Sequence, residues 1–478
     1  MKVDSPAIDI VLSKCINRDT SGKSARYAGG AKQINLAPFL TENSSVTVTR
    51  KINAPAGSFQ ITVGDRGYMH DGTMDSLYGI VEPMDIVEIR MARSPYEYQG
   101  KLPLVFRGVV SEIHRDESMG QDGKPQRSVV ISGQDWGKFL QIIVDKKIRG
   151  NPLGTDWLSN MVMQTHYGIP VAIMSAPDLI QQCVEKIANP FIKKFSDTGA
   201  IVPFLSDVSG ADPTDEAMMQ GYYSNPMGTL WDFIKKYGDL GPFYEMFIDD
   251  TEQGPVLVYR KPPFLAGTTS IYGTQFEAVN VESSQVQRLR ASRSDADVAN
   301  YVWVDHPRTA QLTAMDLNLM SFGQDPATLL LDTPNSSRTL YGVRTLELTS
   351  QHGVILQAAP EAIFKQSKSS FLAYMKEKLR KLKLANQDNV VLESGTMVIA
   401  GNEKVKVGRV LVIQRGRFIG TYYATSVTHT FNPFQSFMTT VQFVRGTGFD
   451  NRSRNEATGV PNPYLQEIGH GPYESAKP

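Results

Sequence analysis

The feature that most constrains this 478-residue chain is the alternation of apolar and polar residues between Ser394 and Gly446. Apolar side chains recur at every second position there, which is the period of half-buried strands. Glycines separate the runs, where tight turns need residues that tolerate positive φ. The segment therefore predicts a small, closed antiparallel β-domain without a cluster of nucleophile, base or metal ligand. The alternating pairs are Thr396/Val398, Val405/Val407, Val410/Val412 and Val441/Phe443, and the glycines are Gly401, Gly408 and Gly416.

Three stretches of the chain carry a resemblance to a known protein family. Residues 105–113 read VFRGVVSEI and are followed at 128–136 by SVVISGQDW. Residues 293–304 read RSDADVANYVWV, and residues 422–431 read YYATSVTHTF. In this order they resemble strands of the baseplate hub proteins of tailed phages, a group that includes late-control D-type proteins and the hub portion of type VI secretion spikes. The resemblance covers about two-thirds of the chain.

The resemblance implies a fold class and a function. The expected fold is mainly β with α+β insertions: two tail-tube-like antiparallel β-barrels, a helical middle region and a smaller β domain. The resemblance implies a structural function at the phage tail baseplate of the virion. The protein would be made late in infection and assembled in the host cytoplasm. Three copies would form a homotrimeric ring that adapts the sixfold tail tube, or a distal tail ring, to the threefold central spike. Other baseplate proteins, the tape-measure protein and DNA passing during genome ejection, without specific binding, are the further expected partners.

The organisation along the chain follows from changes in hydrophobic period and composition. Strand patterns and a closing helix after Asp135 predict a first tube-like barrel at 1–148, and 149–241 is a helical and loop region. A small β-rich domain is expected at 242–345. A helix and a second tube-like barrel are expected at 346–449, and a C-terminal arm at 450–478.

Local signals predict several individual elements. Helices are expected at 152–163, 179–188, 225–237 and 371–384, with Asn225 as an N-cap before Pro226 and with Gly238 or Gly241 as the end of the third helix. A hairpin is expected from 243–249 and 255–260, extended by 285–293 and 298–304.

Composition excludes several classes of function. Lysine plus arginine equals aspartate plus glutamate at 49 each, so the chain lacks the basic excess of a dedicated nucleic-acid binder. Cys15 and Cys183 are too few for a disulfide framework, and Cys15 is expected to be buried in a strand. No secretory signal and no membrane-spanning run is evident.

Candidate chemical motifs are weak, so the sequence predicts a protein that is not an enzyme and has no cofactor or metal. Gly22-Lys23-Ser24 lacks the upstream glycine and the helix of a phosphate-binding loop. The seven histidines lack metal-ligand spacing, and His429 is expected to be a packed or hydrogen-bonded strand residue. Asp249-Asp250 is expected at a solvated hairpin tip, where a glycosidase pair is not formed.

Candidate interface residues and alternative functions complete the sequence-based hypothesis. Trp136, Tyr422, Tyr423 and Arg445 are the candidates for contacts between proteins. The basic helix Lys376–Lys383 is expected to pack by its leucines at the surface. A membrane surface or nucleic acid, or in a hub an acidic partner or a channel wall, are the alternatives. Alternatives for the whole chain are a tail-associated cell-wall hydrolase, an adhesin, or the hub of a contractile secretion or bacteriocin machine. The absence of repeats and the short C-terminal end favour a hub with a separate spike protein.

Overall fold

The computed structural model describes residues 5–15, 33–65, 67–70, 73–119, 123, 125–143, 175–194, 201–211, 228–241, 243–262, 278–305, 330, 333–349, 376–415 and 418–447. Several sequence-based expectations lie outside these residues. They are the Gly22–Ser24 loop, the helix at 152–163, the cap at Asn225, the first turn of the helix at 371–384, the arm at 450–478, and His166, His306, His352 and His470.

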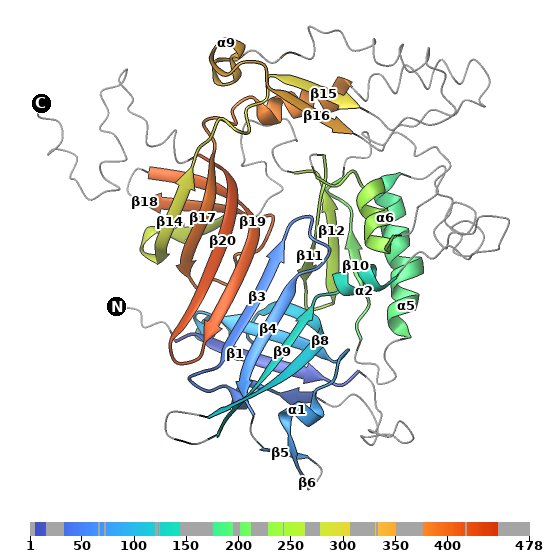
Figure 1. Cartoon of the computed structure of the whole chain (residues 1–478), viewed down its shortest axis with the longest axis vertical. Helices are drawn as coiled ribbons and strands as arrows, with labels where there is room; N and C mark the ends of the chain where they lie inside the picture. Colours follow the sequence, from blue (N-terminus) through green and yellow to red (C-terminus); the bar gives the residue numbers. More distant parts are fainter. Residues whose placement is uncertain are drawn as a thin grey trace, which may run out of the picture.

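One large sheet combines strands from both ends of the chain, which makes the fold mainly β (Figure 1). It has thirteen strands, and eleven of them follow one hydrogen-bonded path. The path is β14 (Val286–Ser292), β17 (Glu393–Ala400), β20 (Ser436–Gly446), β19 (Phe418–Asn432), β3 (Ser45–Lys51), β4 (Ser58–Gly64), β9 (Pro125–Gln134), β8 (Leu104–Met119), β7 (Ile86–Ala92), β1 (Ala7–Ser13) and β2 (Gln33–Asn35). Off this path, β18 (Val410–Arg415) pairs with β13 (Ala278–Glu282) and with β19.

The first β region, residues 5–134, runs from β3 to β2 in the path above. Its strands alternate as the sequence predicts: Val46 and Val48 of β3 are buried, while Thr47 and Thr49 beside them are half-buried. Each of these seven strands contributes to one apolar cluster, together with α1 (Leu77–Ile80) and η1 (Ala37–Phe39). Full burial of each such side chain stabilises the fold by about 1.5–3 kcal/mol. A separate two-stranded sheet is formed by β5 (Gly67–His70) and β6 (Thr73–Ser76).

The second β region contains β13, β14 and β17–β20 around an apolar cluster of its own. Only η7 (Ser283–Gln285) separates β13 from β14, and the two strands pair with different neighbours. β13 pairs with β18, whereas β14 pairs with β17. The hydrogen-bonded path therefore leaves β14, passes through β17, β20, β19 and β18, and returns to the same stretch of chain at β13.

The two β regions share one strand plan. Strands β3, β4, β7, β8 and β9 of the first region are connected like β14, β17, β18, β19 and β20 of the second, in the same chain order. The register shift of the β8–β9 pair between Val110 and Glu112 also has a counterpart in β19–β20, between Ala424 and Ser426. The chain is therefore built from two topological repeats that the residues alone do not reveal.

The two regions meet along β3 and β19, which lie side by side in Figure 1. The edge of β19 is shared: Phe418–Tyr423 pairs with β18 of its own region, and Ser426–Phe431 pairs with β3 of the first region. The joint is antiparallel and extends from Ser426 opposite Lys51 to Phe431 opposite Val46. Backbone hydrogen bonds thus join two units that are distant in sequence into one sheet.

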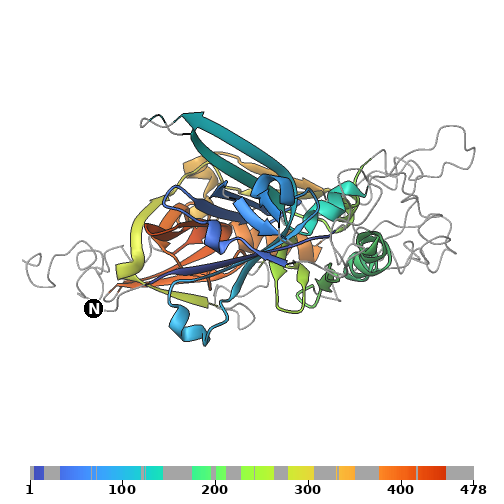
Figure 2. The same cartoon turned by 90° about the horizontal axis from the view of Figure 1, so that it is seen from below.

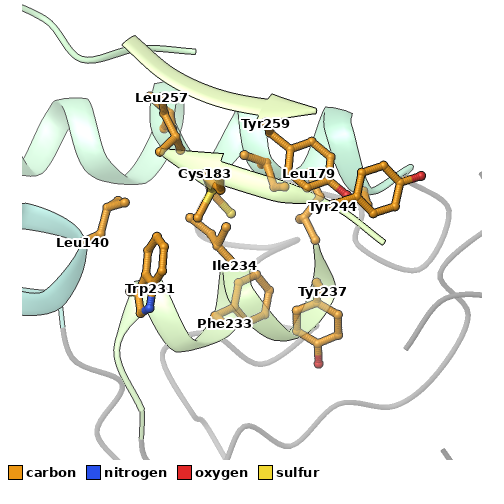
Figure 3. Packing of buried hydrophobic residues seen from close by; sticks show 14 of the residues in the cluster. Leu140, Leu179, Cys183, Trp231, Phe233, Ile234, Tyr237, Tyr244, Leu257 and Tyr259 are labelled. Carbon is orange, nitrogen blue, oxygen red and sulfur yellow. The ribbon is translucent and has the colours of Figure 1, made fainter. Parts of the chain in front are cut away.

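A third core lies beside the two β regions, between helices and a small sheet (Figure 3). The sheet has the order β10 (Leu205–Asp207), β12 (Pro255–Arg260), β11 (Glu245–Asp250). Residues such as Leu179, Ile234 and Tyr259 point into the core from opposite sides. The helices are α2 (Gly137–Ile142), α4 (Ala176–Gln182), the π-helical η4 (Cys183–Ala188), α5 (Asn189–Lys193) and α6 (Leu230–Tyr237).

Three sequence-based expectations need correction here. The helix expected from Asn225 begins as α6 at Leu230, because Thr229 and Asp232 form a capping box there; it ends before Gly238 as expected. The strands expected to extend the β11–β12 hairpin pair elsewhere: β14 joins the large sheet, and β15 (Tyr301–Asp305) pairs with β16 (Thr345–Thr349). The helix expected to close the first barrel, α2, instead packs its Phe139 and Leu140 in the third core.

Candidate functional site at the junction of the three cores

The turn of the β11–β12 hairpin carries carboxylates that bind the first β region, at a place here called the central junction. The Asp250 side chain is fully buried, and its Oδ2 atom accepts hydrogen bonds from the Arg50 guanidinium and from the Arg107 backbone N–H, the latter at 2.6 Å. Arg50 belongs to β3 and Arg107 to β8. The expectation that Asp250 is solvated at a hairpin tip is therefore wrong, because the tip inserts against the sheet.

Further ion pairs continue this contact toward the surface. Glu252 accepts from Arg90 of β7 at 2.6 Å and from Lys101 at 2.7 Å, and these bonds lower the pKa of Glu252 to about 2. Arg107 Nη2 lies 2.8 Å from Glu88. The hairpin is thus held at its turn by cations from three strands of the first region, which restricts its orientation relative to the sheet.

The second β region reaches the same hairpin from the other side. Lys406 Nζ lies 2.6 Å from Asp249 Oδ1. Arg260 of β12 donates to Glu245 at 2.7 Å and to the carbonyl of Gly408 at 2.5 Å, and the Tyr423 hydroxyl donates to Glu245 at 2.6 Å. Burial raises the pKa of Glu245 and Tyr423 above their ordinary values. The hairpin therefore links both β regions to the third core.

Asp135 is a buried carboxyl on the first-region side of the junction. It accepts hydrogen bonds from the backbone N–H groups of Gly57 at 2.8 Å and Gly137 at 3.0 Å, and it lies 3.7 Å from Arg50. Burial raises the pKa of Asp135 to about 7 in spite of the charge of Arg50. Asp135 thus fixes the chain where β9 passes into α2.

His429 confirms the expectation of a hydrogen-bonded strand histidine. Its Nδ1 lies 3.0 Å from the Thr439 hydroxyl and its Nε2 lies 3.1 Å from the Val405 carbonyl. Since the carbonyl only accepts, Nε2 carries the proton and Nδ1 accepts from Thr439. Burial lowers the pKa of His429 to about 4. The imidazole lines a hollow beside Arg50 that has about 20 Å³ of free space, which is room for about one water.

The chemistry of the junction is that of a structural contact. Within the described ranges, no group of three or more His, Cys, Asp or Glu side chains could hold a metal ion. No described helix is long and apolar enough to cross a membrane. Cys15 and Cys183 are both buried and form no disulfide with each other, and Cys15 lies two residues after the end of β1 and not in a strand as expected. The basic helix, described over 376–386, packs by Leu379 and Leu382 as expected, and its Lys378 is buried against Asp239 at 2.7 Å.

The sequence-based interface candidates lie mainly inside the chain. Trp136 is fully buried in the third core, and Tyr422 packs edge-on against Phe443 in the second β region. Tyr423 contacts Glu245 at the central junction. Arg445 is half-buried with a φ of 57°, and burial lowers its pKa to about 10. Contacts of these four residues with other proteins stay a prediction.

Apart from Tyr423 and the Asp249–Asp250 doublet, the residues of the central junction were not predicted from the sequence. Arg50, Arg90 and Arg107 each lie in a strand pattern, where a charged residue reads as solvent-facing. The Asp249–Asp250 doublet was the one local signal, and its position between two strands indicated only a turn.

No model of a known protein family and no curated protein matches the sequence. Among solved structures, the chain is similar to the tail protein from Neisseria meningitidis MC58, with a TM-score of 0.47 and 11% identity over 93% of this chain and 98% of that one. It is similar to the 43 kDa tail protein of prophage MuSo2 from Shewanella oneidensis, with a TM-score of 0.45 and 10% identity over 92% and 97%. The prophage tail protein gp18 from Listeria monocytogenes EGD-e has a TM-score of 0.41 and 11% identity over 91% and 94%.

Proposed function

We propose that this chain is a structural hub of a phage tail baseplate, in which three copies form a ring. The proposal starts from the sequence resemblance at 105–136, 293–304 and 422–431. The first stretch lies largely and the last wholly in strands, in the corresponding strands β8–β9 and β19 of the two repeats, whereas the middle stretch enters a strand, β15, only at its last four residues.

The observation that carries the proposal is the β3–β19 joint between two regions of like plan. One chain supplies two equivalent β units side by side in a continuous sheet. Three copies therefore supply six such units, which suits an adaptor between a sixfold tube and a threefold spike. Closed symmetric rings are a common solution for homo-oligomers.

The central junction supports a mechanical role within this proposal. The buried pairs of Arg50 with Asp250 and of Arg260 with Glu245 hold the third core against both β units. A hub must keep a fixed shape while neighbouring parts bind it and while DNA and the tape-measure protein pass. Binding to the tube, spike and other baseplate proteins is proposed for the faces of the ring.

The mass of the purified full chain in solution tests this proposal. The expected mass by light scattering is about 159 kDa, which is three times 52.9 kDa. A peptidoglycan zymogram of the same sample is expected to show no clearing. A monomer at every attainable concentration would contradict the ring, and clearing of peptidoglycan would favour the hydrolase alternative.

A further inference from the structure

One difference between the two repeats lies at the outer edge of β8. In β19, the residues after the register shift pair with β20 on one side and with β3 of the other region on the other side. In β8, the residues after the corresponding shift pair with β9 alone among the described strands. Figure 2 shows the β8–β9 hairpin (teal) projecting from the body of the protein. No described strand fills beside β8 the position that β3 fills beside β19.

The strand that corresponds to β3 is β14, and it lies at the opposite end of the sheet. Among the described strands β14 pairs only with β17, so its second edge is open as well. Eight strands run from β14 to β8, and each neighbouring pair is antiparallel. Because eight is even, β14 and β8 run in opposite directions. They can therefore pair antiparallel, as β3 and β19 do.

From these observations we propose that the β8 edge of one copy pairs with the β14 edge of a second copy of this chain. This proposal rests on the ring proposed above and identifies the two strand edges that close the ring. Within one chain the described strands β8 and β14 are not paired with each other, and they are the two ends of a run of eight strands. An open edge with a matching edge on an identical chain is a template for strand addition.

The charges of the two edges are complementary. The exposed part of β8, from Glu112 to Met119, has three acidic residues and one arginine, a net charge of −2 with His114 neutral. The strand β14 has two arginines and no acidic residue, a net charge of +2. Both segments expose most of their residues on both faces. A second copy therefore brings opposite charge to each edge, which favours correct pairing over contact of like edges.

The repeat also predicts the register of the contact. Glu112 and Ser426 are the first residues after the two register shifts, so they correspond to each other. In the first region, Glu112 pairs with Ser132, Ser132 with Gln60, and Gln60 with Thr47. In the second region, Ser426 pairs with Gln442, Gln442 with Thr396, and Thr396 with Arg290. Thr47 of β3 therefore corresponds to Arg290 of β14.

The joint between β3 and β19 then places one pair of residues across the new contact. Thr47 lies opposite Thr430, which is the fourth residue after Ser426. The fourth residue after Glu112 is Asp116, so Asp116 of one copy lies opposite Arg290 of the next. Arg288, two residues away on the same face, lies diagonal to Asp116 and within reach of it. Opposite charges directly across a strand pair stabilise it, and like charges destabilise it.

Disulfide trapping tests this register directly. The full chain with Asp116→Cys and Arg290→Cys is treated with diamide, which takes up the two thiol hydrogens as the S–S bond forms. Residues opposite each other in a sheet have Cα–Cα separations that suit a disulfide. Non-reducing gels are expected to show covalent dimers and trimers. The matched control is Asp116→Cys with Ala291→Cys, which places the two thiols on opposite faces and is expected to give at most a trace of cross-link. Native Cys15 and Cys183 are buried and give a low background.

Charge exchange provides a second test that does not depend on oxidation. Asp116→Arg alone and Arg290→Glu alone are each expected to weaken trimer formation by roughly fivefold per contact, and the double variant is expected to restore it. Both residues are exposed, so the variants fold, and their thermal midpoints are expected to match that of the unchanged chain.

The outcomes separate this contact from the ring itself. A trimer by light scattering without the Asp116→Cys/Arg290→Cys cross-link, and without an effect of charge exchange, would overturn the contact and leave the ring. A cross-linked pair in open chains without closed trimers would support the contact and contradict the ring. Monomers without any cross-link would overturn both.

Discussion

Removing the cation of the central junction tests the claim that the β11–β12 hairpin is held by buried charge. The side chain of Arg50 is 11% exposed and that of Asp250 is 0% exposed. Arg50→Met keeps the aliphatic stem but leaves Asp250 without its guanidinium partner and Asp135 without its nearest cation. Removing one partner of a buried pair costs about 3–5 kcal/mol. For a cooperative unit of about 150–250 residues, each kcal/mol lowers the thermal midpoint by about 2–4 °C, so a decrease of about 6–20 °C is expected.

The measurement is a thermal melt by near-UV circular dichroism, with hydrogen exchange of the hairpin to locate the change. The matched control is Arg127→Met, because Arg127 is 51% exposed and its pair with Glu117 is worth about 1 kcal/mol at most. Adding Asp250→Asn to Arg50→Met removes the buried charge and is expected to recover part of the loss. An Arg50→Met midpoint as close to the unchanged chain as that of the control would refute the reasoning.

Three further predictions concern single residues. The pKa of Asp135 is raised to about 7 in the fold from an ordinary value of 3.8, so its contribution to stability is complete below pH 3.8 and is lost as pH rises toward 7. Asp135→Asn is expected to flatten this part of a plot of thermal midpoint against pH. The pKa of His429 is lowered to about 4 from 6.5, so its contribution to stability is complete above pH 6.5 and is lost as pH falls toward 4. His429→Gln is expected to reduce the loss of thermal stability at acid pH. An unchanged fall of the thermal midpoint below pH 6.5 would contradict the burial argument. A Cβ on Gly133 would lie 2.2 Å from the Val109 carbonyl oxygen, so Gly133→Ala is expected to destabilise the first β region by about 1–3 kcal/mol in denaturant melts. The control is Gly64→Ala, because the nearest atom to a Cβ there is 3.5 Å away, and it is expected to change the stability little.

The strands were predictable from the sequence where alternation is strong. The C-terminal run was predicted from residues such as Val441 and Phe443, which are buried while their neighbours are not. The partners of the strands were not predictable in the same way. The pattern of 285–293 identifies a strand but does not say that it joins β17 rather than the β11–β12 hairpin, because alternation describes one strand and pairing depends on the whole fold.

The central junction was hidden from the sequence for a related reason. Arg50 and Asp250 are 200 residues apart in the sequence, so no local spacing links them. A doublet such as Asp249–Asp250 has the same local signal whether its turn is solvated or inserted against a sheet. The family resemblance implied two barrels of one type, but their strand-by-strand equivalence could not be predicted, because it lies in strand order and register shifts and not in matching residues.

Class averages of the purified full chain by electron microscopy test the central claim most directly. The account predicts a closed ring with a central hole, threefold symmetry and six lobes of similar size, one for each β unit. Compact particles without a hole, or rings with another number of lobes, would contradict the account.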